Sequence, residues 1–275
     1  MTERIIYSTD TDQLKGLLNG RELFAIVDRK VKGLPFLKRF GRNIIYLETS
    51  EKMKKMATVE KIAKKMMARG VDRTWLLVGV GGGIVTDITG FVASIYKRGI
   101  NFGFIPTTLL AMTDAAIGGK NGVNMLAYKN MVGTIRQPKF VYVCPQFLKS
   151  FSPTELYKGI PELLKVFPID GKDYFYAADF FVRQYEQVCK NEKLDMPTWQ
   201  ELITKAIRIK CQCKGMSDPF CVKSDRFIKH SFFITIINIF NFVLCEVTNF
   251  LISDSLFSKS HNLSFLTINK MVNHR

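Results

Sequence analysis

Three consecutive glycines at positions 81–83 stand between an apolar run at 75–80 and a helical pattern at 84–96. Glycine lets the backbone approach a ligand closely, and the first N–H groups of a helix, at the positive end of its dipole, suit a diphosphate. Asp28 ends an earlier apolar run, where a carboxylate can accept hydrogen bonds from both hydroxyls of a ribose. The common dinucleotide fingerprint has the glycines first and the acid later. A nucleotide site and a plain strand-to-helix turn therefore both remain open.

A second group of polar residues lies in the segment IPTTLLAMTDAAIGGKNGVNMLAYKN, at 105–130. Thr107 and Thr108 follow a proline at the expected end of a strand, the edge where parallel sheets bind ligands. Further polar residues stand here among small and apolar ones: Asp114, Lys120, Lys129 and Asn130. The GGK at 118–120 lacks the GxxxxGK[ST] spacing, which excludes a Walker A loop. Each lysine alone fits a solvated loop, whereas the combination with threonine and aspartate favours an anion site.

A third pattern is GIPELLK at 159–165. Glu162 and Lys165 are three residues apart and share one helical face. They form either a surface ion pair or a carboxylate metal ligand beside a lysine that holds an anionic substrate.

The elements that must position these residues alternate along the first half of the chain. The pattern predicts helices at 58–70 and 84–96 between strands, which favours an α/β domain with a largely parallel sheet. The expected strands are 23–27, 44–47, 75–80, 102–105 and 140–144. From about residue 151 the pattern becomes helical, including 174–190 and 198–211. We therefore expect an α/β domain at 1–150, the start of a helical domain at 151–210 and a divergent tail at 211–275.

Composition narrows the class of protein. With 47% hydrophobic and 23% charged residues, the 275-residue chain is neither disordered, collagen-like nor a disulfide miniprotein. Its net charge of +16 favours anionic partners, although no aromatic-interleaved basic motif indicates a nucleic acid. Six unevenly spaced Cys and a polar N-terminus lead us to expect a cytoplasmic protein. The uncharged stretch 231–245 is too short and too Asn-rich for a membrane span.

Four segments together resemble the 3-dehydroquinate synthases, a group of sugar-phosphate cyclases. They are GGGIVTDITGFVASIYKRG, IPTTLLAMTDAAIGGKNGVN, YKNMVGTIRQP and GIPELLK, in that order, within a resemblance that covers about residues 23–210. The resemblance implies an N-terminal NAD-binding domain, a helical C-terminal domain and a site between them. It also implies phosphate elimination from 3-deoxy-D-arabino-heptulosonate 7-phosphate to give 3-dehydroquinate in the shikimate pathway, with NAD reduced and then regenerated.

The resemblance assigns roles by position. It implies NAD contacts at Asp28, Glu51, Lys54, Gly82, Gly83, Ile84, Asp87, Thr107, Thr108, Lys120 and Lys129. It implies catalytic or substrate contacts at Arg98, Asp114, Lys120, Asn130, Lys165 and Lys210. Glu162 matches one of three ligands of a zinc or cobalt ion. Lysines and arginines suit this substrate because it carries a carboxylate and a phosphate.

Beyond Lys210 the resemblance stops. The family's GHxxGH segment is missing, and the histidines His230, His261 and His274 have other surroundings. Two of the three metal ligands are thus unaccounted for, which puts the activity of this chain in question. An altered reading frame or a truncated gene would produce such a C-terminus. Another sugar-phosphate cyclase, a polyol dehydrogenase and a non-catalytic NAD-binding remnant remain alternatives, and a homodimer is left open.

Overall fold

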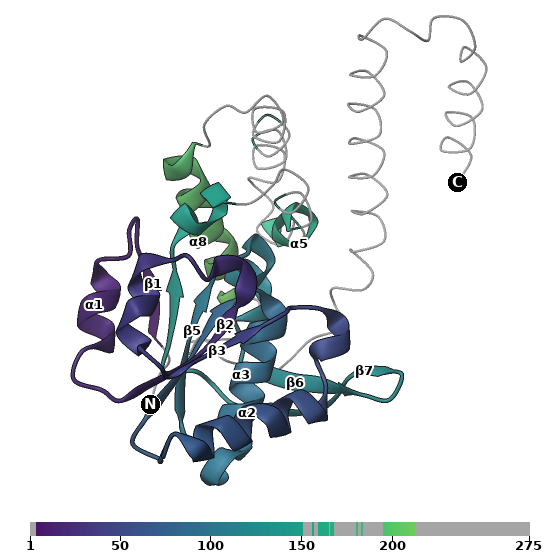
Figure 1. Cartoon of the computed structure of the whole chain (residues 1–275). Coiled ribbons are helices and arrows are strands. Elements are labelled where there is room, and N and C mark those ends of the chain that lie inside the picture. Colours follow the sequence, from purple (N-terminus) through teal and green to yellow (C-terminus); the bar gives the residue numbers. More distant parts are fainter. Residues whose placement is uncertain are drawn as a thin grey trace, which may run out of the picture. The chain divides into compact units, whose positions relative to one another are not determined.

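Six parallel strands form one sheet in the order β1-β8-β5-β4-β2-β3 (Figure 1). The strands are β1 (Arg4–Tyr7), β2 (Leu23–Asp28), β3 (Ile44–Leu47), β4 (Leu76–Gly81), β5 (Asn101–Pro106) and β8 (Phe140–Val143). Every residue of β2, β4 and β8 is buried, as expected for strands covered on both faces. The computed structural model describes residues 4–150, 156, 159–164, 166–167, 180, 183 and 195–212, all within the unit Met1–Ser224.

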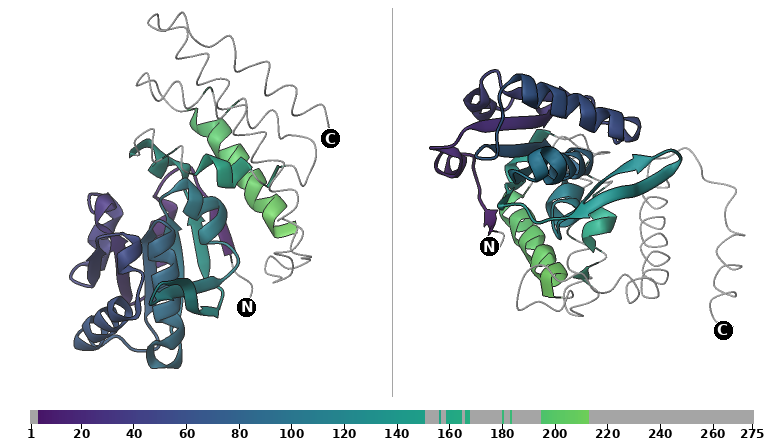
Figure 2. Two further views of the ribbon diagram at one scale, coloured as in Figure 1. Left: turned by 90° about the vertical axis from the view of Figure 1, so that its right-hand side faces the viewer. Right: turned by 90° about the horizontal axis from the view of Figure 1, so that it is seen from below.

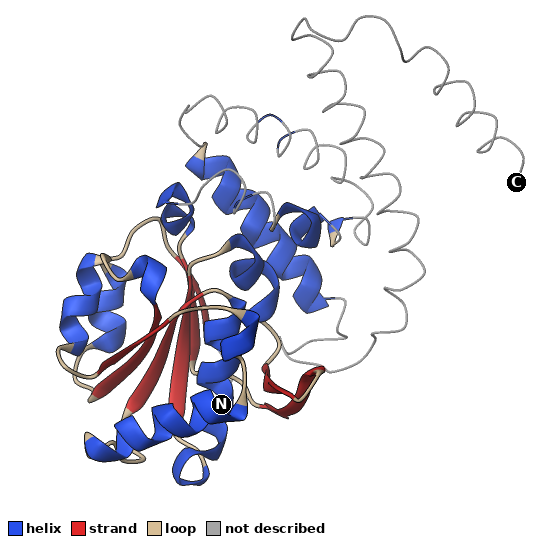
Figure 3. Ribbon diagram, turned by 45° about the vertical axis from the view of Figure 1, so that its right-hand side comes forward, coloured by secondary structure: helices blue, strands red, loops and turns tan. Residues whose placement is uncertain are grey.

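Helices flank the sheet on both sides (Figure 3). The α-helices here are α1 (Gln13–Leu18), α2 (Met56–Ala68) and α3 (Gly83–Ile95). Right-handed crossovers from β3 to β4 and from β4 to β5 place α2 and α3 on one face, where they contact each other. The shorter helical turns are η1 (Arg29–Val31), η2 (Pro35–Phe40), η3 (Glu51–Met53), η4 (Tyr96–Arg98), η5 (Ala111–Ala115) and η6 (Pro145–Ser150).

A two-stranded antiparallel hairpin lies outside the main sheet and runs beside α3 (Figure 2). Its strands are β6 (Lys120–Met125) and β7 (Tyr128–Ile135). The hairpin approaches α3 so closely at Gly90 that a Cβ there would fall 1.8 Å from Oδ1 of Asn121. Asn121 in turn donates to the carbonyls of Gly119 and Arg136, which closes the base of the hairpin.

Two further helices, α5 (Ile160–Leu164) and α8 (Met196–Gln212), belong to the more C-terminal part. Asp195 caps α8 by accepting from the Thr198 backbone N–H at 3.5 Å, and it also accepts from the Thr198 hydroxyl at 2.6 Å. Trp199 is fully buried. None of the helices that the structure describes is both long and apolar enough to cross a membrane.

The predicted α/β fold with a parallel sheet is confirmed, and the five predicted strands match the observed ones to within one residue at each end. The sequence analysis missed β1, α1 and the β6–β7 hairpin. The helix predicted at 174–190 and the tail beyond residue 212 lie outside the described residues, and the domain boundaries at 150 and 210 stay predictions.

Candidate active site

The carboxyl ends of three adjacent strands bring Asp28, Gly81 and Thr107 to one edge of the sheet. The strands β2, β4 and β5 are neighbours, and each ends at or just before one of these residues. The Thr107 N–H donates to the Gly81 carbonyl at 3.0 Å, and a Cβ on Gly81 would fall 3.0 Å from Cβ of Asp28. Open parallel sheets bind ligands at this edge. The fold thus brings together three residues that the sequence places at the ends of separate strands.

Asp28 is held in place by its own surroundings. Its carboxylate accepts from the backbone N–H of Lys30 at 2.9 Å and from the Thr49 hydroxyl at 2.8 Å, one bond on each oxygen. The residue is only 7% exposed. Because a carboxylate oxygen can accept more than one hydrogen bond, both oxygens keep capacity for a ligand such as a ribose diol.

The three glycines form the turn that leads from β4 into α3. Gly81 has φ of 158°, and a Cβ there would fall 2.8 Å from Cγ2 of Val85, so a side chain does not fit. Gly82, Gly83 and Ile84 are partly exposed. The first N–H groups of a helix have no partner within it, and Gly82 at the N-cap has no side chain to satisfy them. The turn therefore offers amide donors and a positive dipole end to an anion.

Two threonines border this turn on the β5 side. Thr107 is 1% exposed, and its hydroxyl has no hydrogen-bond partner among the residues that the structure describes. A buried hydroxyl without a partner is unfavourable, and a ligand at the turn would supply one. Thr108 lies 3.1 Å from the position of a Cβ on Gly82, and its hydroxyl accepts from the Ala111 N–H at 3.2 Å. Thr108 thus starts the turn that carries Asp114.

A charged cluster lies one helical turn further along α3. The ammonium of Lys54, at the end of η3, donates to the carboxylate of Asp87 and to the side-chain oxygen of Asn130. Lys54 is 6% exposed. Burial raises the pKa of Asp87, Lys54 opposes this, and the charges of Asp114 and Glu51 raise the pKa slightly further. The cluster thus joins η3, α3 and the hairpin around one buried ammonium.

Asn124, on β6, was not singled out by the sequence analysis and lies at the centre of this cluster. Its amide donates to the Glu51 carboxylate at 2.8 Å, and its side-chain oxygen accepts from the Asn130 N–H at 2.9 Å. Its own N–H donates to the Lys54 carbonyl at 2.8 Å. The only signal in the sequence was an asparagine beside the other polar residues of 105–130.

On the other side of the site, Lys210 on α8 contacts Asp114 on η5. The Lys210 ammonium donates to both the carboxylate and the backbone carbonyl of Asp114, the latter at 2.8 Å. Both residues were predicted to be part of the site, and 96 positions separate them. The contact brings α8 next to the turn that follows β5.

The structure does not bring every predicted residue to this edge. Arg98 lies in η4, after α3 and before β5, so it is at the opposite edge of the sheet from the glycine turn, exposed and with φ of 64°. Lys120 and Lys129 are exposed on the hairpin, Lys129 directly beside Asn130. Within this chain, therefore, Arg98 is separated from the other predicted site residues by the length of α3.

The metal site cannot be built from the described part of the chain. Glu162 lies in α5, where only its backbone is described, and Lys165 lies outside the described residues. Among described residues, no three His, Cys, Asp or Glu side chains are grouped to hold an ion. Catalytic zinc normally needs three protein ligands. The residues described here thus do not make up the zinc or cobalt site that the resemblance implies.

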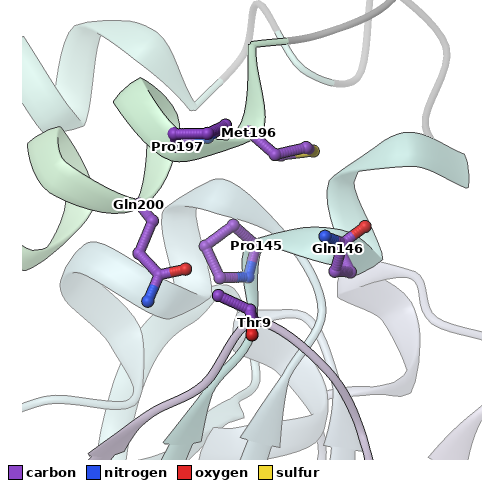
Figure 4. Close-up of a pocket in the computed structure, with 6 residues that line it drawn as sticks. All are labelled: Thr9, Pro145, Gln146, Met196, Pro197 and Gln200. Atoms are coloured by element: carbon purple, nitrogen blue, oxygen red, sulfur yellow. The ribbon is translucent and has the colours of Figure 1, made fainter.

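A separate pocket of about 290 Å³ lies near the ends of β1 and β8, at the start of α8 (Figure 4). It is lined by Thr9, Pro145, Gln146, Met196, Pro197 and Gln200. None of these side chains is charged or was predicted to be functional. The pocket follows the carboxyl ends of β1 and β8, and its lining does not include Asp28, Gly81 or Thr107.

The fold is shared with sugar-phosphate cyclases. The valiolone synthase ValA of Streptomyces hygroscopicus subsp. jinggangensis 5008, whose structure was solved with NAD⁺ and Zn²⁺ bound, superposes with a TM-score of 0.63 at 25% sequence identity. The match covers 78% of this chain and 62% of ValA.

Within that class, residues 44–158 match the profile of the 3-dehydroquinate synthase N-terminal region. The 3-dehydroquinate synthase of Pyrococcus furiosus is 46% identical over 141 residues, which are 51% of this chain and 42% of that enzyme. That of Campylobacter jejuni subsp. doylei is 36% identical over 212 residues, 75% of this chain and 60% of that enzyme. The resemblance to 3-dehydroquinate synthases is thereby confirmed, and the chain spans roughly half the length of these relatives.

Proposed function

We propose that this chain binds NAD at the Gly81–Gly83 turn and acts as a 3-dehydroquinate synthase, releasing phosphate from 3-deoxy-D-arabino-heptulosonate 7-phosphate. The observation that carries the proposal is the convergence of Asp28, the glycine turn and Thr107 at one sheet edge, next to the Lys54–Asp87–Asn130 cluster. The similarity to 3-dehydroquinate synthases supports it.

The residues at this edge fit a dinucleotide. In the proposal, Asp28 accepts from a ribose diol and the amides at the start of α3 bind the diphosphate. Thr107 donates its buried hydroxyl to the cofactor, which would relieve its lack of a partner. Glu51 and Asp87 face the remaining polar groups of the nucleotide. Bound NAD would supply reversible hydride transfer.

Basic residues beside this edge suit a doubly anionic substrate. Lys210 is already oriented by Asp114, and Lys129 and Lys120 extend from the hairpin that Asn130 anchors to Lys54. Ammonium groups at several points can bind a carboxylate and a phosphate at once. Lys165 stays a predicted substrate contact, and Glu162 a predicted metal ligand, with no step assigned to the metal. Arg98 is given no role in this proposal, since the length of α3 separates it from the site within one chain.

The test uses the full chain in two measurements. Fluorescence titration with NADH should give saturable binding, and Asp28→Asn should weaken that binding about tenfold because an amide accepts one fewer hydrogen bond from the ribose. Phosphate release from the heptulosonate phosphate is then assayed with NAD and with added zinc or cobalt. As a matched control, Asp72→Asn changes an exposed aspartate that accepts from the N–H and hydroxyl of Thr74, and it should leave NADH affinity unchanged.

The outcomes separate the alternatives. NADH binding with phosphate release and no accumulating NADH supports the synthase. NADH binding without phosphate release would mean that the chain binds the nucleotide but does not catalyse the synthase reaction. Accumulation of NADH with a polyol as substrate would identify a dehydrogenase. Absence of saturable NADH binding would refute the proposal.

A further inference from the structure

Asn124 connects Glu51 on η3 to Asn130 on the hairpin, beside the Lys54–Asp87 pair. Its amide donates to Glu51 on η3, and its side-chain oxygen accepts from the backbone N–H of Asn130 on β7. The Asn124 N–H also donates to the Lys54 carbonyl, and Asn124 forms an isolated parallel bridge with Lys55. One residue thus fixes the hairpin to the segment that carries Glu51 and Lys54.

The bond to Asn130 has a conformational consequence. Asn130 has φ of 53°, a left-handed conformation that non-glycine residues rarely adopt and that asparagine tolerates best. Asn124 holds the backbone of Asn130 in that conformation, in which the Asn130 side chain accepts from the Lys54 ammonium. That ammonium also binds Asp87. A continuous chain of polar contacts therefore runs from Glu51 through Asn124 and Asn130 to Lys54 and Asp87.

We propose that Asn124 is a positioning residue for the cofactor: by binding Glu51 and Asn130 together it orients the Glu51 carboxylate and the Lys54–Asp87 pair toward the nucleotide. This inference rests on the proposed function, since it presupposes that NAD binds here. Asn124 itself need not touch the cofactor. Its effect on the nucleotide then passes through Glu51 and through Asn130, and the hydrogen bond to Glu51 couples Asn124 and Glu51 energetically.

Reciprocal substitutions test the coupling. Asn124→Asp keeps the acceptor for the Asn130 N–H but replaces the donor to Glu51 by an anionic oxygen. Glu51→Gln supplies a new amide donor, so the double variant restores a hydrogen bond with donor and acceptor exchanged. NADH dissociation constants are measured for the wild type, both single variants and the double variant, together with each chain's urea unfolding midpoint.

We expect N124D to weaken NADH binding about fivefold in the wild-type background and less than about twofold in the E51Q background. The matched control is Asn43→Asp, which makes the same change on a partly buried residue just before β3, at the other end of the strands. N43D should leave NADH affinity unchanged. If N124D unfolds the chain, Asn124→Ala removes the amide donor to Glu51 without adding charge, and its effect on NADH affinity should likewise be smaller in the E51Q background.

Equal effects of the Asn124 substitution in both backgrounds, or no effect on NADH affinity, would overturn the inference while leaving the proposed function in place. A coupling seen in the unfolding midpoint but not in the dissociation constant would show a purely structural role and would also overturn it. A wild-type chain that binds no NADH would instead refute the proposed function.

Discussion

The Lys54 ammonium binds the Asp87 carboxylate although 33 residues separate them, and it does so with 7% of its side chain exposed against 20% for Asp87. The pair joins η3 to the second turn of α3. A buried ion pair adds little stability by itself, but removal of one partner leaves the other charge uncompensated.

Lys54→Met should therefore lower the free energy of unfolding by about 2 kcal/mol. It should also weaken NADH binding, because Asp87 and Asn130 both lose the group that orients them. Urea unfolding and NADH titration measure the two effects. The matched control is Lys64→Met, which breaks an exposed pair with Glu60 and should change stability by less than about 0.5 kcal/mol. Equal effects of the two substitutions would contradict the role assigned to Lys54.

Asp87 should make stability depend on pH. Burial raises its pKa above the value of 3.8 that it has in the unfolded chain, so the folded state binds the proton more tightly. Well below that value both states are protonated and the contribution is zero. As the pH rises from the unfolded-state pKa through the folded-state pKa, the unfolded chain loses the proton first, and stability falls. Asp87→Asn cannot ionise. The stability of the wild type relative to this variant should consequently fall in urea unfolding as the pH rises above about 4. A rise over this range would show that Lys54 outweighs burial.

Gly81→Ala should disrupt the turn, because the new Cβ would fall 2.8 Å from Val85 and 3.0 Å from Asp28. We expect a loss of about 2 kcal/mol in stability and at least tenfold weaker NADH binding. Gly16→Ala is the matched control. Nothing lies within 4 Å of a Cβ at this position inside α1, so it should raise stability by up to about 1 kcal/mol without altering NADH affinity. If Gly81→Ala binds NADH as tightly as the wild type, the cofactor does not bind at this turn.

Thr107→Val should have opposite effects on stability and on binding. Removing a buried hydroxyl without a described partner should raise the stability of the free protein by about 1 kcal/mol. The same change should weaken NADH binding about fivefold if the hydroxyl contacts the cofactor. Thr89 is also fully buried, on α3 against Gly79, and its hydroxyl has no partner among the described residues either. Thr89→Val should thus stabilise the protein and leave NADH affinity unchanged. If the two variants bind NADH equally well, the Thr107 hydroxyl does not contact the cofactor.

The order of strands and helices could be predicted because the apolar runs and helical periods of the sheet domain are local features. The glycine turn, Asp28 and Thr107 each follow a strand, so the rule that parallel strands end at a common edge sufficed to group them. The β6–β7 hairpin was missed because β7 has mostly exposed side chains and lacks the alternation that marks a half-buried strand.

What the sequence determined by itself is thus five of the strands and the glycine turn, since each of these depends on neighbours along the chain. The contacts Lys54–Asp87, Lys54–Asn130 and Lys210–Asp114 join residues 33, 76 and 96 positions apart, so no local spacing encodes them. Only the tertiary structure decided them, because packing of the hairpin on α3 and of α8 on η5 brings those side chains together. Arg98, in contrast, lies at the far end of α3. The sequence motif had grouped it with the site, and the fold separates the two within one chain.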